Sequence, residues 1–104
     1  MSEVRLPASV KAVRVDDVDE RCATPGAFKF VSYEGQTAGM IYVCPCGCGR
    51  QGFLAFRGAP RPPERAERPS WIWDGNRDAP TLSPSVHHVG HWHGWLRAGM
   101  WEQH

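Results

Sequence analysis

The sequence predicts a mostly β, small single-domain fold with little helix, in which a β-hairpin carries a zinc knuckle. Short apolar and aromatic runs alternate with turn residues along all 104 residues, and the chain contains eleven glycines and nine prolines. No stretch shows a convincing helical period. Three cysteines crowd into the segment Cys44–Cys48, a grouping typical of metal sites. We therefore expect one zinc-binding domain over residues 1–104.

Two strands are predicted before the cysteines. Residues Lys11–Val15 and Phe28–Tyr33 each alternate apolar with polar side chains, the period of a half-buried strand. A short helix over Asp16–Arg21 is the one helical alternative in this region. Cys22 stands alone, and we interpret it as a packed or inert thiol.

The cysteine cluster lies between two apolar runs. Met40–Val43 leads into it and Phe53–Phe56 leads away from it, so the two runs predict a β-hairpin whose tip is the metal knuckle. Residues 57–69 then form a Pro/Arg-rich stretch with four prolines after Gly58, which is typical of an extended surface loop.

The second half of the chain continues the β pattern. Trp71–Trp73 is a short predicted strand followed by an Asp-Gly-Asn turn signal. Thr81–Val86 is predicted as an edge or irregular strand because Pro84 has no N–H to donate. Residues His93–Leu96 and Met100–Trp101 are predicted to form a hairpin. We interpret the five tryptophans as packing for the core or for the wall of a site.

Charge and composition argue against several function classes. The net charge of +1 gives no electrostatic case for nucleic acid or a membrane surface. The segment Met1–Val15 mixes charged with apolar residues, so it does not read as a signal peptide, and no segment approaches the roughly 20 apolar residues of a membrane span. A cytoplasmic location is therefore predicted, where thiols stay reduced and clustered cysteines more often bind metal than pair.

Metal geometry restricts how the cysteines can act. Zinc–sulfur bonds of about 2.3 Å require two bound thiolates within roughly 4 Å of each other, whereas residues i and i+2 of a strand sit nearly 7 Å apart. Cys44, Cys46 and Cys48 can therefore share an ion only from a curled loop, which Gly47 and Gly49 permit. Which two or three of them bind stays open.

Histidines are the expected second half of the metal site. His91 and His93 lie on one side of a predicted strand, which is a chelating arrangement. His87 and His88 point to opposite faces, so at most one of them is expected to reach the metal. His104 is expected to be free.

The number of ligands decides the function class. Three cysteines and one histidine close the zinc tetrahedron and imply a structural site, whereas two cysteines and one histidine leave a position for a catalytic water. The signatures of the zinc deaminases and the His-Glu-x-x-His pattern of metalloproteases are absent from the sequence. A hydrolase also needs a proton shuttle and an oxyanion donor, for which the candidates are Glu34, Asp74, Asp78, Ser83 and Ser85. Each of these side chains also has an ordinary explanation as a turn former or a local cap.

Four motifs occur in a fixed order: CPCGCG from Cys44, WxWDGN from Trp71, PTLSPS from Pro80 and HGWLxxG from His93. Over roughly residues 28–101 the chain thereby resembles a family of small proteins of unknown function from bacteria, phages and other mobile elements. The resemblance implies zinc binding. Some members are encoded beside prokaryotic ubiquitin-like conjugation genes, where a processing peptidase is expected. The family has a cysteine where this chain has Gly90, so His91 or His88 would replace that ligand.

The sequence thus predicts a Zn²⁺ protein with Cys44, Cys46, Cys48, His91 and His93 as metal ligands. The first function hypothesis is a zinc-dependent hydrolase, specifically a peptidase that processes a protein or ubiquitin-like substrate. Zinc-bound water would be its nucleophile, Glu34 or Asp74 its base, and Ser83 or Ser85 a polarising group. The alternative is a non-catalytic zinc module that mediates protein or nucleic-acid contacts, and a third hypothesis is a redox or metal sensor.

Overall fold

The computed structural model describes residues 9–18, 24–63 and 68–104. All of the secondary-structure elements assigned there are β-strands, which confirms the mostly β prediction. Residues 16–18 of the alternative helix are not helical; the rest of that segment falls outside the described residues, as does Cys22. None of the described elements is a helix of the length and apolar character needed to cross a membrane.

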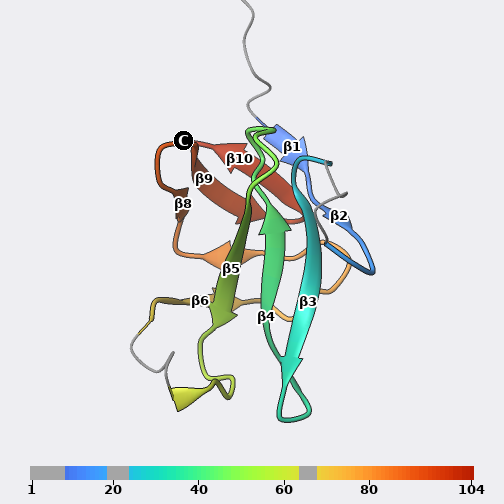
Figure 1. Cartoon of the computed structure of the whole chain (residues 1–104), viewed down its shortest axis with the longest axis vertical. Helices are drawn as coiled ribbons and strands as arrows, with labels where there is room; N and C mark the ends of the chain where they lie inside the picture. Colours follow the sequence, from blue (N-terminus) through green and yellow to red (C-terminus); the bar gives the residue numbers. More distant parts are fainter. Residues whose placement is uncertain (1–8, 19–23, 64–67) are drawn as a thin grey trace, which may run out of the picture.

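The strands form two sheets (Figure 1). The four-stranded sheet has the order β1 (Ser9–Lys11), β10 (Met100–Gln103), β9 (Trp92–Arg97) and β8 (Val86–His88). The six-stranded sheet has the order β2 (Val13–Arg14), β3 (Ala27–Tyr33), β4 (Gln36–Val43), β5 (Gln51–Phe56), β6 (Ser70–Trp73) and β7 (Leu82–Ser83). Both predicted hairpins are present, but two predicted strands are divided. Lys11–Val15 is split at Ala12 between β1 and β2, which belong to different sheets, and Thr81–Val86 is split around Pro84 into β7 and the start of β8.

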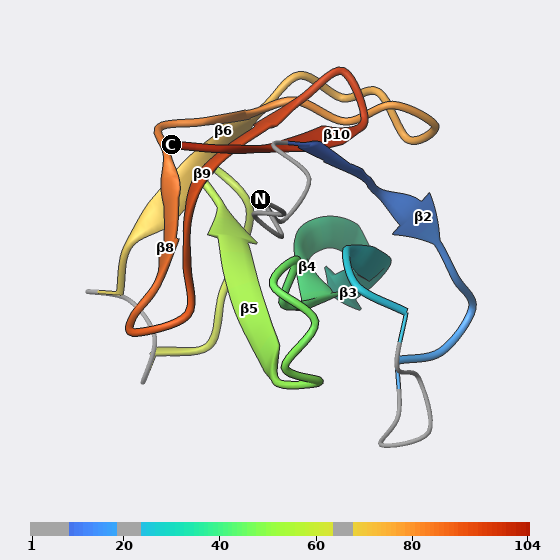
Figure 2. The same ribbon diagram turned by 90° about the horizontal axis from the view of Figure 1, so that it is seen from above.

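Figure 2 shows the six-stranded sheet curling so that β3–β5 lie opposite β9 and β10. Alternate side chains from the two sheets fill the space between them. The buried members are Phe28, Met40, Tyr42, Leu54 and Phe56 from the six-stranded sheet and Val86, Trp92, Leu96 and Trp101 from the four-stranded sheet. The buried indole of Trp101 donates a hydrogen bond to the carbonyl of Gly26 at 3.0 Å, so its polar atom is satisfied. Aromatic packing therefore supplies much of this core, as the sequence suggested.

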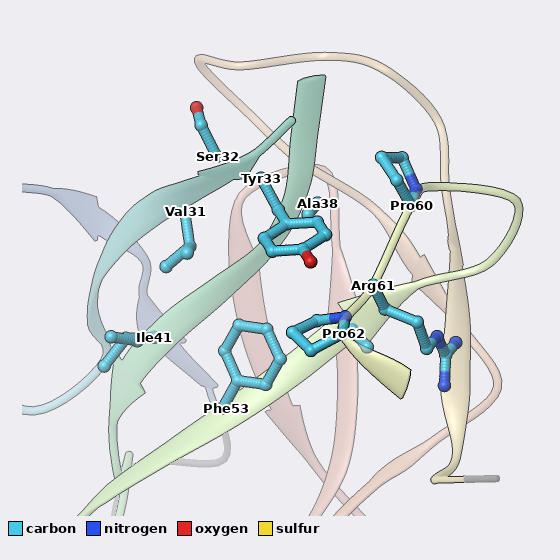
Figure 3. A pocket seen from close by; sticks show the side chains of 10 residues that line it. Val31, Ser32, Tyr33, Ala38, Ile41, Phe53, Pro60, Arg61 and Pro62 are labelled. Atoms are coloured by element: carbon cyan, nitrogen blue, oxygen red, sulfur yellow. The ribbon is translucent and has the colours of Figure 1, made fainter. Parts of the chain in front are cut away.

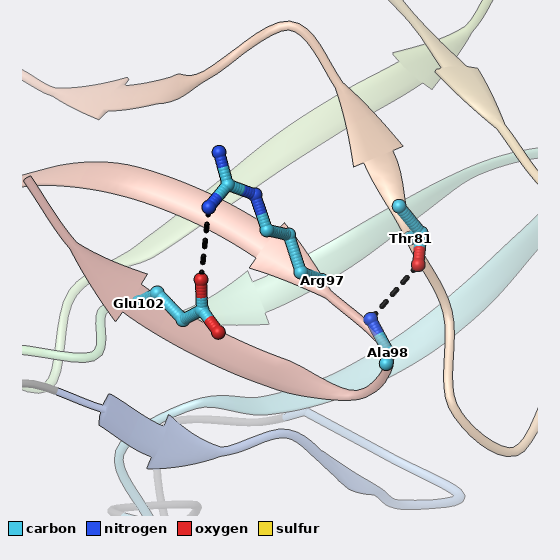
Figure 4. A network of polar contacts seen from close by, with 4 residues as sticks. All are labelled: Thr81, Arg97, Ala98 and Glu102. Carbon is cyan, nitrogen blue, oxygen red and sulfur yellow. Dashed lines mark hydrogen bonds and ion pairs between the residues drawn. The ribbon is translucent and has the colours of Figure 1, made fainter.

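The segment that leads to β8 is tied to the β9–β10 turn. The backbone N–H of Ala98 donates to Thr81 Oγ1 at 2.8 Å (Figure 4), and the N–H of Gly99 donates to the carbonyl of Pro80 at 3.0 Å. The same hairpin carries an exposed ion pair between Arg97 and Glu102. These bonds fix where the chain enters the segment Pro84–Ser85.

Candidate functional site

The tip of the β4–β5 hairpin brings three thiols together. The N–H of Cys44 donates to the carbonyl of Arg50 at 2.8 Å, and the N–H of Gly47 donates back to the carbonyl of Cys44 at 3.1 Å. Gly47 and Gly49 have φ angles of 90° and 81°, in the left-handed region that favours glycine. The loop is therefore curled, and the sulfur atoms of Cys44, Cys46 and Cys48 all lie within 4.8 Å of one another, close enough to hold one metal ion.

The pKa values of two of the thiols are shifted in opposite directions. Burial raises the pKa of the Cys44 thiol to about 12, and its sulfur lies 3.3 Å from that of Cys46. Cys48 is exposed, and a hydrogen bond from the backbone N–H of Arg50 lowers its thiol pKa. Because a metal binds the thiolate form, Cys44 must lose its proton to bind, and Cys48 loses its proton more readily.

The histidines do not join the cysteine group. Among the described residues, that group contains the three cysteines alone. His88 projects toward the core, where its Nδ1 lies 3.0 Å from the hydroxyl of Tyr42. His91 lies in the β8–β9 turn with its ring 5.3 Å from that of His88. Burial lowers the pKa of His88, and the nearby charges of His91 and Arg50 lower it further.

His93 lies on the opposite face of the same hairpin and meets a serine. His93 Nε2 is 3.2 Å from Ser85 Oγ, and the contact is partly buried. His87 pairs with His93 across the two strands, with ring centroids 4.9 Å apart. The structure thus separates His91 from His93 and places His93 beside Ser85, two residues to which the sequence assigned different roles.

Two aromatic rings complete the surroundings of His93. The ring of His104 stacks on it at a centroid distance of 5.0 Å and an interplanar angle of 20°. Trp95 lies beside both, 5.3 Å from His104 and 6.4 Å from His93. His104 is exposed and lies outside the cysteine group, but its ring packs on that of His93. Among the described residues, no carboxylate forms a hydrogen bond or ion pair with His93.

The acidic residues proposed from the sequence lie in turns. Glu34 is exposed in the β3–β4 turn with a φ of 51°. Asp74 is also exposed, and its Oδ1 accepts hydrogen bonds from the N–H groups of Asn76 at 3.0 Å and Thr81 at 3.3 Å. Asp78 is exposed beyond that turn. Ser83 is exposed in β7, two residues before Ser85.

Trp71 also belongs to the site, whereas the sequence indicated only a packing role for it, in the core or in the wall of a site. Its indole N–H donates to the carbonyl oxygen of Ser85 at 3.1 Å, which fixes the backbone that carries the serine hydroxyl. The available signal was the polar end of the indole, because tryptophan N–H groups in partly buried positions usually find an acceptor.

An apolar hollow of about 300 Å³ lies elsewhere, on the β3–β5 part of the six-stranded sheet (Figure 3). Tyr33, Ile41 and Phe53 form part of its lining, and the segment Pro60–Pro62 borders it. None of the side chains proposed from the sequence as ligands or catalytic groups lines this hollow.

The molecule is thus a small β protein with a serine–histidine pair on one face of a hairpin and a cysteine cluster able to hold a metal at the tip of another. Residues 14–104 match the family described as bacterial ubiquitination-like system serine protease (BubE). The chain belongs to this family. No curated protein and no solved structure matches the chain. Membership indicates a protease of a ubiquitination-like system with a protein substrate or partner.

Proposed function

We propose that this chain is a serine peptidase that cleaves a ubiquitin-like protein substrate, with Ser85 as nucleophile and His93 as general base. The observation that carries the proposal is the 3.2 Å contact between Ser85 Oγ and His93 Nε2, the distance over which a base can accept the hydroxyl proton. The serine protease description of the family supports the same chemistry.

The steps follow from this geometry. Ser85 Oγ attacks the scissile carbonyl carbon while its proton passes to His93 Nε2, which requires the neutral tautomer protonated on Nδ1. Collapse of the tetrahedral adduct breaks the C–N bond, and His93 returns the proton to the leaving amine. Water then attacks the carbonyl carbon of the acyl ester and gives a proton to His93. The bond from that carbon to Ser85 Oγ breaks, the acid leaves, and His93 returns the proton to Ser85 Oγ.

The rings around His93 orient the imidazole, which is one part of the role that a carboxylate has in a Ser-His-Asp triad. The stacked His104 ring restricts the rotation of the imidazole, and the N–H of His104 donates to the carbonyl of His93 at 2.8 Å. Trp71 holds the Ser85 backbone through its carbonyl. In this proposal neighbouring residues hold both Ser85 and His93 in place, so the reacting atoms meet without a prior rearrangement of either side chain.

For the cysteine cluster we propose Zn²⁺ as the bound metal. The donor set fits, because thiolates are ligands that zinc prefers and the three sulfur atoms already converge. Bound there, zinc would cross-link the ends of β4 and β5 and would stabilise the fold. In this proposal His93 is engaged with Ser85, which leaves His91 or His88 as the candidate for a further ligand.

The test separates the two serines of the PTLSPS motif. The substrate is the cognate ubiquitin-like protein with a C-terminal extension, and cleavage is followed by mass spectrometry. Ser85→Ala is expected to lose at least about a thousandfold in kcat/KM, whereas Ser83→Ala, its matched control, stays within about twofold. A fluorophosphonate should label the wild type at Ser85.

A zinc-dependent hydrolase, the function expected from the sequence, predicts a different result. In that case the fluorophosphonate does not label Ser85, and a chelator abolishes cleavage while circular dichroism shows an intact fold. That set of results would overturn the serine assignment. Loss of activity together with unfolding on chelation is the outcome expected for a structural metal.

A further inference from the structure

Strand β8 lies at an open end of the four-stranded sheet, immediately after the proposed nucleophile. The sheet order places β9 on one side of β8 and no strand of the described residues on the other. Figure 1 shows β8 at the outer margin of the molecule. Ser85 directly precedes this strand, and its side chain lies on the same face as those of His87 and His93.

The register shows which backbone groups the open edge presents. The carbonyl of His93 accepts a hydrogen bond from His104, so the polar backbone atoms of His93 point toward β10 and away from β8. His87 is opposite His93 and therefore belongs to a pair that exchanges no hydrogen bonds. The N–H and C=O of His87 consequently point outward from the sheet.

The neighbouring backbone groups are already engaged. His88 and Val86 face β9, where they pair with Trp92 and Gly94, and the carbonyl of His88 also accepts from His91 at 2.9 Å. The carbonyl of Ser85 accepts from Trp71. Within β8, the backbone groups that point outward are thus the N–H and the C=O of His87, two residues from the Ser85 hydroxyl.

We propose that this edge docks the extended segment of the protein substrate that contains the scissile bond, as an added strand beside β8. This inference rests on the proposed function. A peptide backbone fits the edge because it supplies one acceptor for the N–H of His87 and one donor for its C=O. Residues two apart in a strand are about 7 Å apart, so the docked position lies about two residues from the bond next to Ser85.

The test uses tail peptides of the cognate ubiquitin-like protein, each with one backbone N-methyl group, so that the protein itself is unchanged. Methylation at the one position that faces the His87 carbonyl should lower kcat/KM at least about tenfold, through the lost hydrogen bond and a clash. Methylation at the two adjacent positions, whose N–H groups point away from β8, should change kcat/KM less than about twofold. Equal effects at all positions would overturn the proposal.

A second measurement follows amide hydrogen exchange at the open edge of β8. In Ser85→Ala protein, which retains the edge, the amide of His87 should exchange more slowly with solvent after the unmethylated peptide is added, while the exposed amide of Gly75 serves as a control. Unchanged exchange of the His87 amide at saturating peptide would overturn the proposal. It would also be overturned if this amide already exchanges slowly without peptide because two copies of the chain pair through β8. Fluorophosphonate labelling of Ser85 in the wild type separates these outcomes from failure of the proposed function, which predicts no labelling.

Discussion

The hydroxyl of Tyr42 and Nδ1 of His88 lie 3.0 Å apart, and this contact joins the cysteine-bearing hairpin to the strand that follows Ser85. Burial raises the pKa of Tyr42 to about 12, with further contributions from Cys44 and Cys48, so the phenol stays protonated at neutral pH. His88 projects to one face of β8 and His87 to the other. The hairpin tip with the cysteine cluster and the serine–histidine pair are thus connected through a single strand, β8.

Removal of the Tyr42 hydroxyl should destabilise the protein. In Tyr42→Phe the ring stays in place while Nδ1 of His88 loses its partner in a partly buried position, which should cost about 1 kcal/mol of the free energy of unfolding. Urea denaturation followed by circular dichroism measures the change. Tyr33→Phe is the matched control, with an expected change below about 0.5 kcal/mol; equal effects of the two substitutions would contradict this prediction.

Loss of the stacked ring should slow catalysis more than it weakens substrate binding. His104→Ala removes the contact with His93 and should lower kcat about three- to tenfold, with KM within about twofold, because the imidazole gains rotational freedom. His104→Phe retains a stacking ring and should recover most of the loss. If both variants fall equally, the ring acts through its nitrogen atoms and not through stacking.

Gly94 should tolerate no side chain. A Cβ at this position would lie 2.0 Å from the carbonyl oxygen of Glu102 and 2.7 Å from the ring of Trp92, so Gly94→Ala should destabilise the protein by about 3 kcal/mol or more. Gly75→Ala is the comparison, since it meets open space and carries only the strain of its φ of 86°, about 1 kcal/mol. Thermal unfolding of the two variants distinguishes them, and a Gly94→Ala protein as stable as the wild type would contradict the packing.

Zinc affinity should rise with pH. The pKa of Cys44 is raised to about 12, so its thiol is protonated at neutral pH and must release a proton when the metal binds. Each proton released makes the apparent affinity about tenfold higher per pH unit. Competition with a chromophoric chelator at pH 6, 7 and 8 measures this slope. An affinity independent of pH would show that Cys44 is not a ligand.

The local patterns were sufficient to predict the hairpins and the crowding of the thiols. The alternation in Phe28–Tyr33 and the glycines after Cys46 and Cys48 influence only the backbone of neighbouring residues, so these features can be recognised in a single sequence. The contact between Ser85 and His93 depends instead on the register of β8 with β9. That register follows from a turn centred on Gly90, and the sequence reasoning ended the preceding strand at Val86. Both residues were candidates, but His93 was assigned to the metal site and not to the serine.

The hydrogen bond between Trp71 and Ser85 could not be predicted from the sequence, for a related reason. The two residues are separated by a segment with the Asp74 turn and the short strand β7, and only the folded path of that segment brings them together. Similarly, the His104 ring reaches His93 because β10 pairs with β9 along its full length. Contacts of this kind are set by the tertiary fold and not by spacing.

His87 and His88 lie on opposite faces of β8, and each makes contacts on its own face, so the register of β8 with β9 cannot change by one residue without the loss of both sets of contacts. Because side chains in a strand alternate with a period of two, the insertion or deletion of one residue between Ser85 and Gly90 would exchange the two faces. His88 would then lie beside the serine, and His87 would turn toward the tyrosine. In any lineage of such chains, the length of this short stretch should therefore be far less free to vary than the identity of its exposed side chains.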